Sequence, residues 1–170
     1  KFHLDSFFTG LEDFLRQFPD YREIQNIDKI GEKSSVLYLG MDLKKFDEFK
    51  IEKSENDLPL ILWNHRWEHD KNPETFFDAL IQLSQMGGKF NLAVLGEEFK
   101  EELPCFTHAR KQLQKHIVQF GYTDSFEEYT KWLWKADILP VTSNQDFFGG
   151  SIMEAVYCKT IPLLPSQLTY

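Results

Sequence analysis

Residues 58–73 read LPLILWNHRWEHDKNP, and this stretch decides the fold class. It begins with an apolar run from Leu58 to Asn64, whose length suits a buried strand. A polar segment follows, and Pro73 then stands where the first residue of a helix is expected, because proline is well tolerated there. The order strand, polar loop and helix predicts the start of an α/β unit with its loop at the carboxyl end of the strand.

The same alternation continues toward the end of the chain. The helix that begins at Pro73 is expected to end near Met86, before the glycine pair at 87–88. Ser125 is expected to cap a later helix, with Glu128 completing a capping box. The remaining predicted strands are 90–95, 117–120, 137–141 and 161–164, and the remaining helices are 106–114, 125–135 and 150–158. Strands that alternate with helices predict right-handed crossovers and a doubly wound, Rossmann-like parallel sheet.

The ligand crevice of such a sheet lies beyond the carboxyl ends of its strands. Three loops follow predicted strand ends, at 65–71, 121–124 and 143–151. We expect these loops to converge on one crevice.

The residues before this alternation read differently. Residues 4–18 are expected to form an amphipathic helix with an unusually apolar face, capped by Asp5 or Ser6 and ended by Pro19. Residues 20–33 look turn-like, 35–39 suggest a strand, and 44–57 suggest a charged linker or loop. We therefore divide the chain into 1–33, the helical remnant of a preceding N-terminal domain with its connector, and 34–170, a domain that looks cut at both ends.

The composition limits the kinds of partner. The chain has 170 residues, 42% of them hydrophobic, with a formal net charge of −8 and a pI near 5.1. A broad nucleic-acid surface is not expected on so acidic a domain. The two cysteines fit neither a disulfide framework nor a metal site and suggest a reducing cytoplasm. No apolar run has the length of a membrane span.

A second motif, NQDFFGGSIMEA at residues 144–155, carries the functional prediction. Gly149 and Gly150 stand at an apparent helix start, where unpaired N–H groups and the helix dipole suit a phosphate. Asp146 precedes them and Glu154 follows, and a carboxylate here accepts hydrogen bonds from sugar hydroxyls. A site for a diphosphate beside a site for a sugar predicts a nucleotide-sugar ligand. Alternatively, Asp146 is only a helix N-terminal acid and Glu154 a solvated helix residue.

Arg66 and Lys71 supply cations after the first strand of the sheet. Arginine offers a planar fork to phosphate oxygens and lysine a point charge, so both suit a diphosphate. Alternatively, the two side chains pair with Glu68 and Asp70 at the surface.

Other site chemistries receive less support. His65 and His69 lie four residues apart near two acids, but the segment does not look helical, so we expect no metal site. No Asp-x-Asp motif, P-loop, nucleophile elbow or Ser-His-Asp set is visible. Most aromatic residues are expected to pack in the core. Tyr122, after the glycine at a strand end, is the candidate for contact with a nucleotide base.

These residues resemble the C-terminal, donor-binding half of retaining GT-B glycosyltransferases of the group 1 type. That family carries an Arg and a Lys after the first strand of this domain, and an acid-x7-Glu motif containing Phe-Gly. The resemblance implies that Arg66 and Lys71 bind the donor diphosphate, helped by the backbone of Gly149 and Gly150. It places Glu154 on the ribose. Asp146, with Phe147 and Phe148, would contact the hexose, and no metal cofactor would be needed. Asp146 departs from the usual Glu, and Gly150 from a common aliphatic residue, which weakens the hexose assignment.

Four segments are similar to the tRNA-queuosine mannosyltransferase group: 2–7, 63–73, 146–149 and 154–158. The similarity implies GDP-mannose as donor and queuosine in a tRNA as acceptor. The acceptor and the tRNA would be held mainly by the missing N-terminal domain, so we expect the isolated chain to bind nucleotide without transferring sugar. In the absence of that domain, the apolar face of residues 2–18 would be covered by self-association of the chain. The competing hypothesis is a non-catalytic α/β module that binds a phosphorylated ligand or a protein partner.

Overall fold

The computed structural model describes residues 1–53, 58–96, 103–168 and 170. The chain forms two compact units, one spanning Lys1–Gly40 and one that begins at Met41. Within the described residues, no helix is both long and apolar enough to cross a membrane.

The first unit contains two helices, α1 (Phe2–Arg16) and α2 (Asn26–Lys33). Gly31 of α2 lies against the ring of Phe8, because a Cβ at this glycine would stand 3.9 Å from it. No residue of Lys1–Gly40, all of which is described, is buried. The apolar residues of α1 therefore remain largely exposed; Phe7 and Phe14 are 54% and 55% exposed.

The predictions for this unit need four corrections. The first helix begins at Phe2, so Asp5 and Ser6 lie inside it and neither caps it. It ends at Arg16, before Pro19. Residues 26–33, expected as turns, form α2, whose charged residues alternate with Ile27 and Ile30 at helical spacing. Residues 35–39 belong to no strand, because they pair with none of the described strands.

The second unit is built on a parallel sheet of five strands in the order β3-β2-β1-β4-β5. The strands are β1 (Leu60–Trp63), β2 (Asn91–Val94), β3 (Ile117–Phe120), β4 (Ile138–Pro140) and β5 (Ile161–Leu163). The connecting helices are α3 (Pro73–Gln85), α4 (Pro104–Gln112), α5 (Phe126–Lys135) and α6 (Gly150–Tyr157). The doubly wound prediction is confirmed, and the strand order reverses between β1 and β4.

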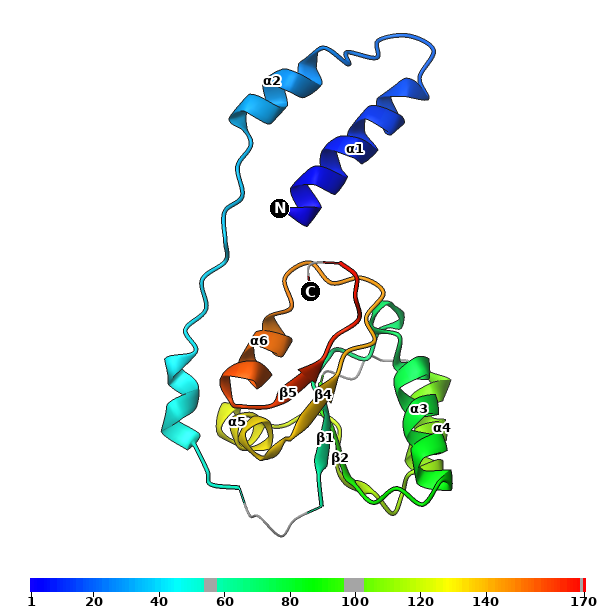
Figure 1. Ribbon diagram of the computed structural model, residues 1–170, viewed down its shortest axis with the longest axis vertical. Helices are drawn as coiled ribbons and strands as arrows, with labels where there is room; N and C mark the ends of the chain where they lie inside the picture. Colours follow the sequence, from blue (N-terminus) through cyan, green and yellow to red (C-terminus); the bar gives the residue numbers. More distant parts are fainter. Residues whose placement is uncertain (54–57, 97–102, 169) are drawn as a thin grey trace. The chain divides into compact units, whose positions relative to one another are not determined.

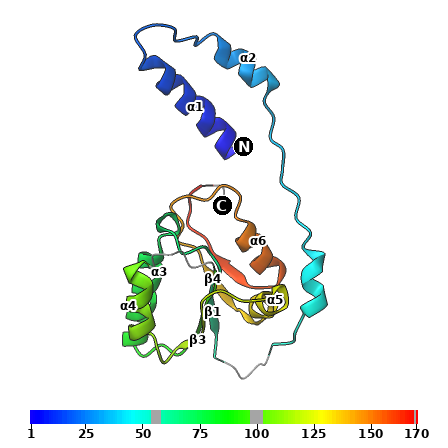
Figure 2. The ribbon, with the colours of Figure 1, turned by 180° about the vertical axis from the view of Figure 1, so that it is seen from behind.

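Helices cover both faces of the sheet, with α3 and α4 on one side and α5 and α6 on the other (Figures 1 and 2). Strand β1 shows why. Ile61 and Trp63 join the cluster that includes Phe76 and Phe106, whereas Leu60 and Leu62 join the opposite cluster with the helix residues Leu133 and Ile152. Alternate side chains of a strand point to opposite faces, so an uninterrupted apolar run is what a sheet covered on both sides requires.

Local capping follows the predictions closely for two helices. Pro73 is the first residue of α3, and Ser125 Oγ accepts the amide of Glu128 at 3.1 Å to cap α5. The segment 44–57 was interpreted as a loop. Instead, Lys44–Phe49 forms a 3₁₀ helix, η1, whose Phe46 is fully buried, while 54–57 lie outside the described residues.

Candidate functional site

A cleft of about 260 Å³ lies at the carboxyl ends of β1 and β4, where the strand order reverses. It is lined by residues 64–66 and 71 after β1, and by 146 and 148–151 of the β4–α6 loop and the first turn of α6. Two of the three predicted loops therefore meet. The third does not, because no residue of 121–124 lines the cleft. A larger cavity of about 660 Å³ includes Leu60, Asn91 and Asp137, at the opposite, amino ends of the strands. We place the site in the smaller cleft because parallel sheets bind ligands at carboxyl ends.

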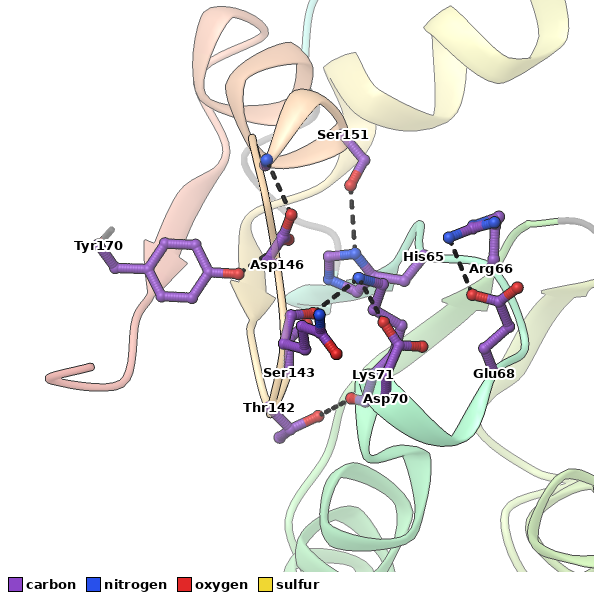
Figure 3. Close-up of polar contacts among 12 residues, drawn as sticks. His65, Arg66, Glu68, Asp70, Lys71, Thr142, Ser143, Asp146, Ser151 and Tyr170 are labelled. Atoms are coloured by element: carbon purple, nitrogen blue, oxygen red, sulfur yellow. Dashed lines mark hydrogen bonds and ion pairs between the residues drawn. The ribbon is translucent and has the colours of Figure 1, made fainter. Parts of the chain in front are cut away.

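The two predicted cations both line the cleft, and both already contact acids (Figure 3). Arg66 Nη2 lies 2.9 Å from Glu68 Oε2, and Lys71 Nζ lies 3.0 Å from Asp70 Oδ2. Lys71 Nζ also donates to the carbonyl of Gln145 at 3.0 Å. The surface-pairing alternative is thus realised in the empty cleft. Both cations still line the cleft, so a ligand phosphate that makes several contacts at once can replace these acids as their partner.

Lys71 also helps to join the two loops. Its side chain is 11% exposed, and the bond to Gln145 crosses from the β1–α3 loop to the β4–α6 loop. The hydroxyl of Thr142 donates to the carbonyls of Lys71 and Asn72 at 2.9 and 3.0 Å, and the carbonyl of Asp70 accepts from the Asn144 amide at 2.8 Å. These contacts to backbone carbonyls fix the position of the Lys71 backbone relative to the β4–α6 loop.

Asp146 holds the entrance of α6. Its Oδ1 accepts the amide of Gly149 at 2.9 Å, and its Oδ2 accepts the hydroxyl of Tyr170 at 2.8 Å. Burial and the contact with Asp146 raise the pKa of Tyr170 above its ordinary value, so this phenol stays a donor. The alternative of a helix N-terminal acid is therefore realised. The carboxylate retains lone pairs for a sugar hydroxyl.

The first turn of α6 opens onto the cleft. Gly149 is the N-cap with φ 73°, a conformation that glycine adopts without strain. The amides at the start of a helix have no acceptor within the helix, so Gly150 and Ser151 are positioned to offer N–H groups to an anion. The glycine positions predicted from the sequence thus coincide with a helix entrance at the cleft.

Glu154 does not line the cleft, but a hydrogen-bonded chain leads from it to a residue that does. The Tyr129 hydroxyl donates to Glu154 Oε2 at 2.7 Å and accepts from Asn64 Nδ2 at 3.5 Å. Asn64 lines the cleft and also donates to the carbonyl of Ser151 at 2.8 Å. Burial, followed by the charge of Glu154, raises the pKa of Tyr129 well above its ordinary value. Glu154 is half-buried and hydrogen-bonded, and its ribose contact remains a prediction.

Only one of the three aromatic residues predicted to contact the ligand lines the cleft. Phe148 lines the cleft, whereas Phe147 is 80% exposed and does not. Tyr122 is 67% exposed and also lies outside the lining. The base and hexose contacts of Tyr122 and Phe147 remain predictions.

The two histidines of the β1–α3 loop lie in different environments. His65 is buried, and its Nδ1 lies 3.1 Å from the Ser151 hydroxyl. His69 is largely exposed and lies near Glu74. In the described part of the chain, no three His, Cys, Asp or Glu side chains gather to hold a metal ion. Metal independence nevertheless remains a prediction.

Sequence reasoning missed five residues of this site: Asn64, His65, Tyr129, Ser151 and Tyr170. His65 was considered only as a metal ligand. Its place directly after a buried strand was the available signal, since such positions face the crevice. Tyr129 and Tyr170 act from elements distant in sequence, and no local pattern identifies them.

The fold and cleft together define a Rossmann-like ligand-binding domain. Comparison with known proteins then assigns its family. Residues 44–166 match the family described as Glycosyl transferases group 1, and residues 1–41 match a family described as tRNA-queuosine alpha-mannosyltransferase N-terminal. The chain belongs to the glycosyl transferases group 1 family.

Individual relatives agree with this assignment. The chain is 32% identical over 177 residues to the tRNA-queuosine alpha-mannosyltransferase of Drosophila melanogaster, covering 100% of this chain and 47% of that protein. The chain thus spans about half the length of this curated relative. Among solved structures, the C-terminal domain of a glycosyl transferase group 1 protein from Francisella tularensis matches with a TM-score of 0.56 and 21% identity, covering 72% of this chain and 69% of that one. Anabaena HepE in complex with UDP matches with a TM-score of 0.57 and 16% identity, covering 81% and 41%. These two structures support the GT-B type of fold.

Proposed function

We propose that this chain carries the donor site of a retaining glycosyltransferase that binds a nucleotide-diphosphate sugar. One observation carries the proposal: Arg66, Lys71 and the first turn of α6 line the same cleft. Each provides hydrogen-bond donors or positive charge, so the cleft suits a ligand rich in oxygen acceptors and negative charge. Charge neutralisation by these groups makes a metal ion unnecessary for diphosphate binding.

The proposed sugar-side roles come from the family resemblance. Glu154, oriented by Tyr129, accepts hydrogen bonds from the ribose hydroxyls. Asp146, which closes the entrance of α6 with Phe148 nearby, accepts from a hexose hydroxyl. These assignments rest on the family resemblance and on the carboxylates' remaining acceptor capacity.

We further propose GDP-mannose as the donor and queuosine in a tRNA as the acceptor, with the reaction in the cytoplasm. The support is the identity to the Drosophila enzyme and the match of residues 1–41 to the N-terminal family of that group. The net charge of −8 fits a domain that leaves the tRNA to another part of the enzyme.

Calorimetry with GDP and UDP tests the donor site. We expect dissociation constants of about micromolar to millimolar for the 170-residue chain, and a loss of about tenfold or more for Arg66→Ala and for Lys71→Ala. Lys89→Ala, an exposed cation at the amino end of β2, is the matched control and should bind as the parent does. Absence of heat with both nucleotides at millimolar concentration would reject the site. Unchanged binding by Arg66→Ala and Glu154→Ala would favour the non-catalytic module instead.

The acceptor is tested on the complete enzyme that contains this chain. A panel of nucleotide-sugars, with and without queuosine-containing tRNA, should give transfer only with GDP-mannose and the modified tRNA. The product should keep the anomeric configuration of the donor, and activity should survive chelation. Activity that disappears on chelation and returns with a divalent ion would contradict the metal-independent mechanism.

A further inference from the structure

His65 has one ring nitrogen engaged and one unused. The side chain is 3% exposed and lines the cleft. Nδ1 lies 3.1 Å from Ser151 Oγ, at the first turn of α6 (Figure 3). Nε2 is buried and has no hydrogen-bond partner within the described part of the chain. A buried polar atom without a partner is costly, so its presence at a cleft calls for a ligand or another functional explanation.

The imidazole is neutral near pH 7. Burial, followed by the charge of Lys71, lowers the pKa of His65 to about 4, although Asp146 and Asp70 act in the opposite direction. A neutral ring has one donor and one acceptor nitrogen. If the Ser151 hydroxyl donates to Nδ1, the proton resides on Nε2, and that nitrogen becomes a donor.

The groups that line the cleft favour one tautomer in the complex. Arg66, Lys71 and the amides of Gly150 and Ser151 offer donors, so this part of the lining suits an occupant rich in acceptors, and Asp146 is the carboxylate beside them. An acceptor-rich occupant is bound by Nε2–H and repelled by a lone pair at that nitrogen. The diphosphate of the donor supplies such oxygen atoms.

We propose that His65 binds a phosphate oxygen of the nucleotide diphosphate through Nε2–H, as an uncharged donor whose tautomer is fixed by the Ser151 hydroxyl. The proposal rests on the donor site proposed above and adds a third side chain to Arg66 and Lys71. It requires that the ligand uncover Nε2. Lys71, which Asp70 and the Gln145 carbonyl hold, is a flexible cation of the cleft lining that a phosphate would attract.

Two amide substitutions separate the ring nitrogens. In His65→Gln the side-chain nitrogen occupies about the place of Nε2, which keeps the donor to the ligand and loses the partner of Ser151. In His65→Asn the amide oxygen occupies about the place of Nδ1, which keeps the Ser151 contact and loses the donor. Calorimetry of the 170-residue chain with GDP should show affinity near that of the parent for His65→Gln and a loss of about tenfold for His65→Asn. Thermal unfolding confirms that both variants fold.

The outcomes are separable. If the parent binds GDP and His65→Asn binds equally well, or better than His65→Gln, the histidine acts only through Ser151 and the inference is wrong while the donor site stands. If the parent binds neither GDP nor UDP, both proposals fail. ¹⁵N NMR of the imidazole gives a second readout. The free chain should show a neutral ring protonated on Nε2 from pH 6 to 8, with the Nε2 resonance shifting on addition of GDP, and a proton on Nδ1 in the complex would overturn the inference.

Discussion

Gly96 is the second residue after β2, and its conformation and surroundings fit no other residue type. Its φ is 111°, and a Cβ at this position would stand 2.1 Å from the carbonyl oxygen of His65. Leu95 next to it also binds the β1 end, because its amide donates to the Trp63 carbonyl at 2.7 Å and its carbonyl accepts from Trp67 Nε1 at 3.1 Å. Leu95 and Gly96 therefore pack against the end of β1 and the segment that carries His65.

Substitution of Gly96 should be more harmful than its backbone angle alone predicts. Gly121 has a similar φ of 117° but no atom within 4 Å of the position a Cβ would take. Gly121→Ala is thus the matched control for the strain, about 1–3 kcal/mol. Gly96→Ala adds a clash with backbone and should lower the free energy of unfolding by more than this control, measured by urea denaturation. Equal losses in the two variants would show that the contact with His65 relaxes freely.

At the scale of elements, α5 and α6 are joined by the hydrogen bond from the Tyr129 hydroxyl to Glu154 Oε2, and Asn64 connects this bond to the cleft lining. The hydroxyl occupies one carboxylate oxygen and leaves the other for a ligand, and it restricts the rotamers that Glu154 can adopt. Tyr129 is therefore a positioning residue for the proposed ribose contact. Because the ring also packs against Phe46, removing only the hydroxyl preserves most of the packing.

Tyr129→Phe should weaken GDP binding by about three- to tenfold, because the carboxylate must then be ordered by the ribose itself. Binding of 2′,3′-dideoxy-GDP should be the same in the variant and the parent, since that nucleotide lacks the hydroxyls. Tyr157→Phe removes another phenol–carboxylate bond, of 2.8 Å to Asp47, outside the cleft and is the control. Equal losses for both nucleotides in calorimetry would reduce Tyr129 to a structural role.

The 3₁₀ helix η1 shows why an element can escape sequence analysis. Four of its six residues are charged, which favoured a loop. The structure instead uses Phe46, which is fully buried, and the Phe46 carbonyl accepts from Trp134 Nε1 at 2.9 Å. A single aromatic residue that inserts between α5 and α6 leaves no periodic pattern to detect.

At the scale of the whole molecule, the two units differ in how they are stabilised. The second unit has a buried cluster on each face of its sheet, and Lys1–Gly40, described throughout, buries no residue. The first unit therefore builds no buried core of its own, and its residues 1–41 match the family described as tRNA-queuosine alpha-mannosyltransferase N-terminal.

A chain of residues 41–170 should retain the donor site. All cleft-lining residues lie within it, and the residues of both buried clusters belong to it. We expect its GDP affinity to agree with that of the full chain within about twofold, since independent sites contribute additively. Calorimetry checks the affinity and heteronuclear NMR checks the fold. A large loss of binding in a folded 41–170 chain would show that the first unit contributes to the site.

The sequence predicted most of what depends on periodicity and punctuation. Apolar runs located all five strands, and Pro73, Ser125 and the Gly149–Gly150 pair located helix starts. It also identified Arg66, Lys71 and Asp146, which line the cleft. It missed α2, whose residues are largely polar. It also predicted a strand at 35–39 that the structure does not contain, because the apolar residues there find no neighbouring strand. It missed Tyr129 and the contacts of His65 because their environment comes from segments distant in the chain.

The acids beside the two cations have a consequence for selectivity. With Glu68 on Arg66 and Asp70 on Lys71, each cation already has an anionic partner, and an incoming anion must displace an internal rival at each of them. A lone inorganic phosphate meets that competition with few contacts to compensate. A molecule whose two linked phosphates, pentose and sugar engage several anchors at once overcomes it, so the built-in rivals act as a filter against the abundant small anions of the cell.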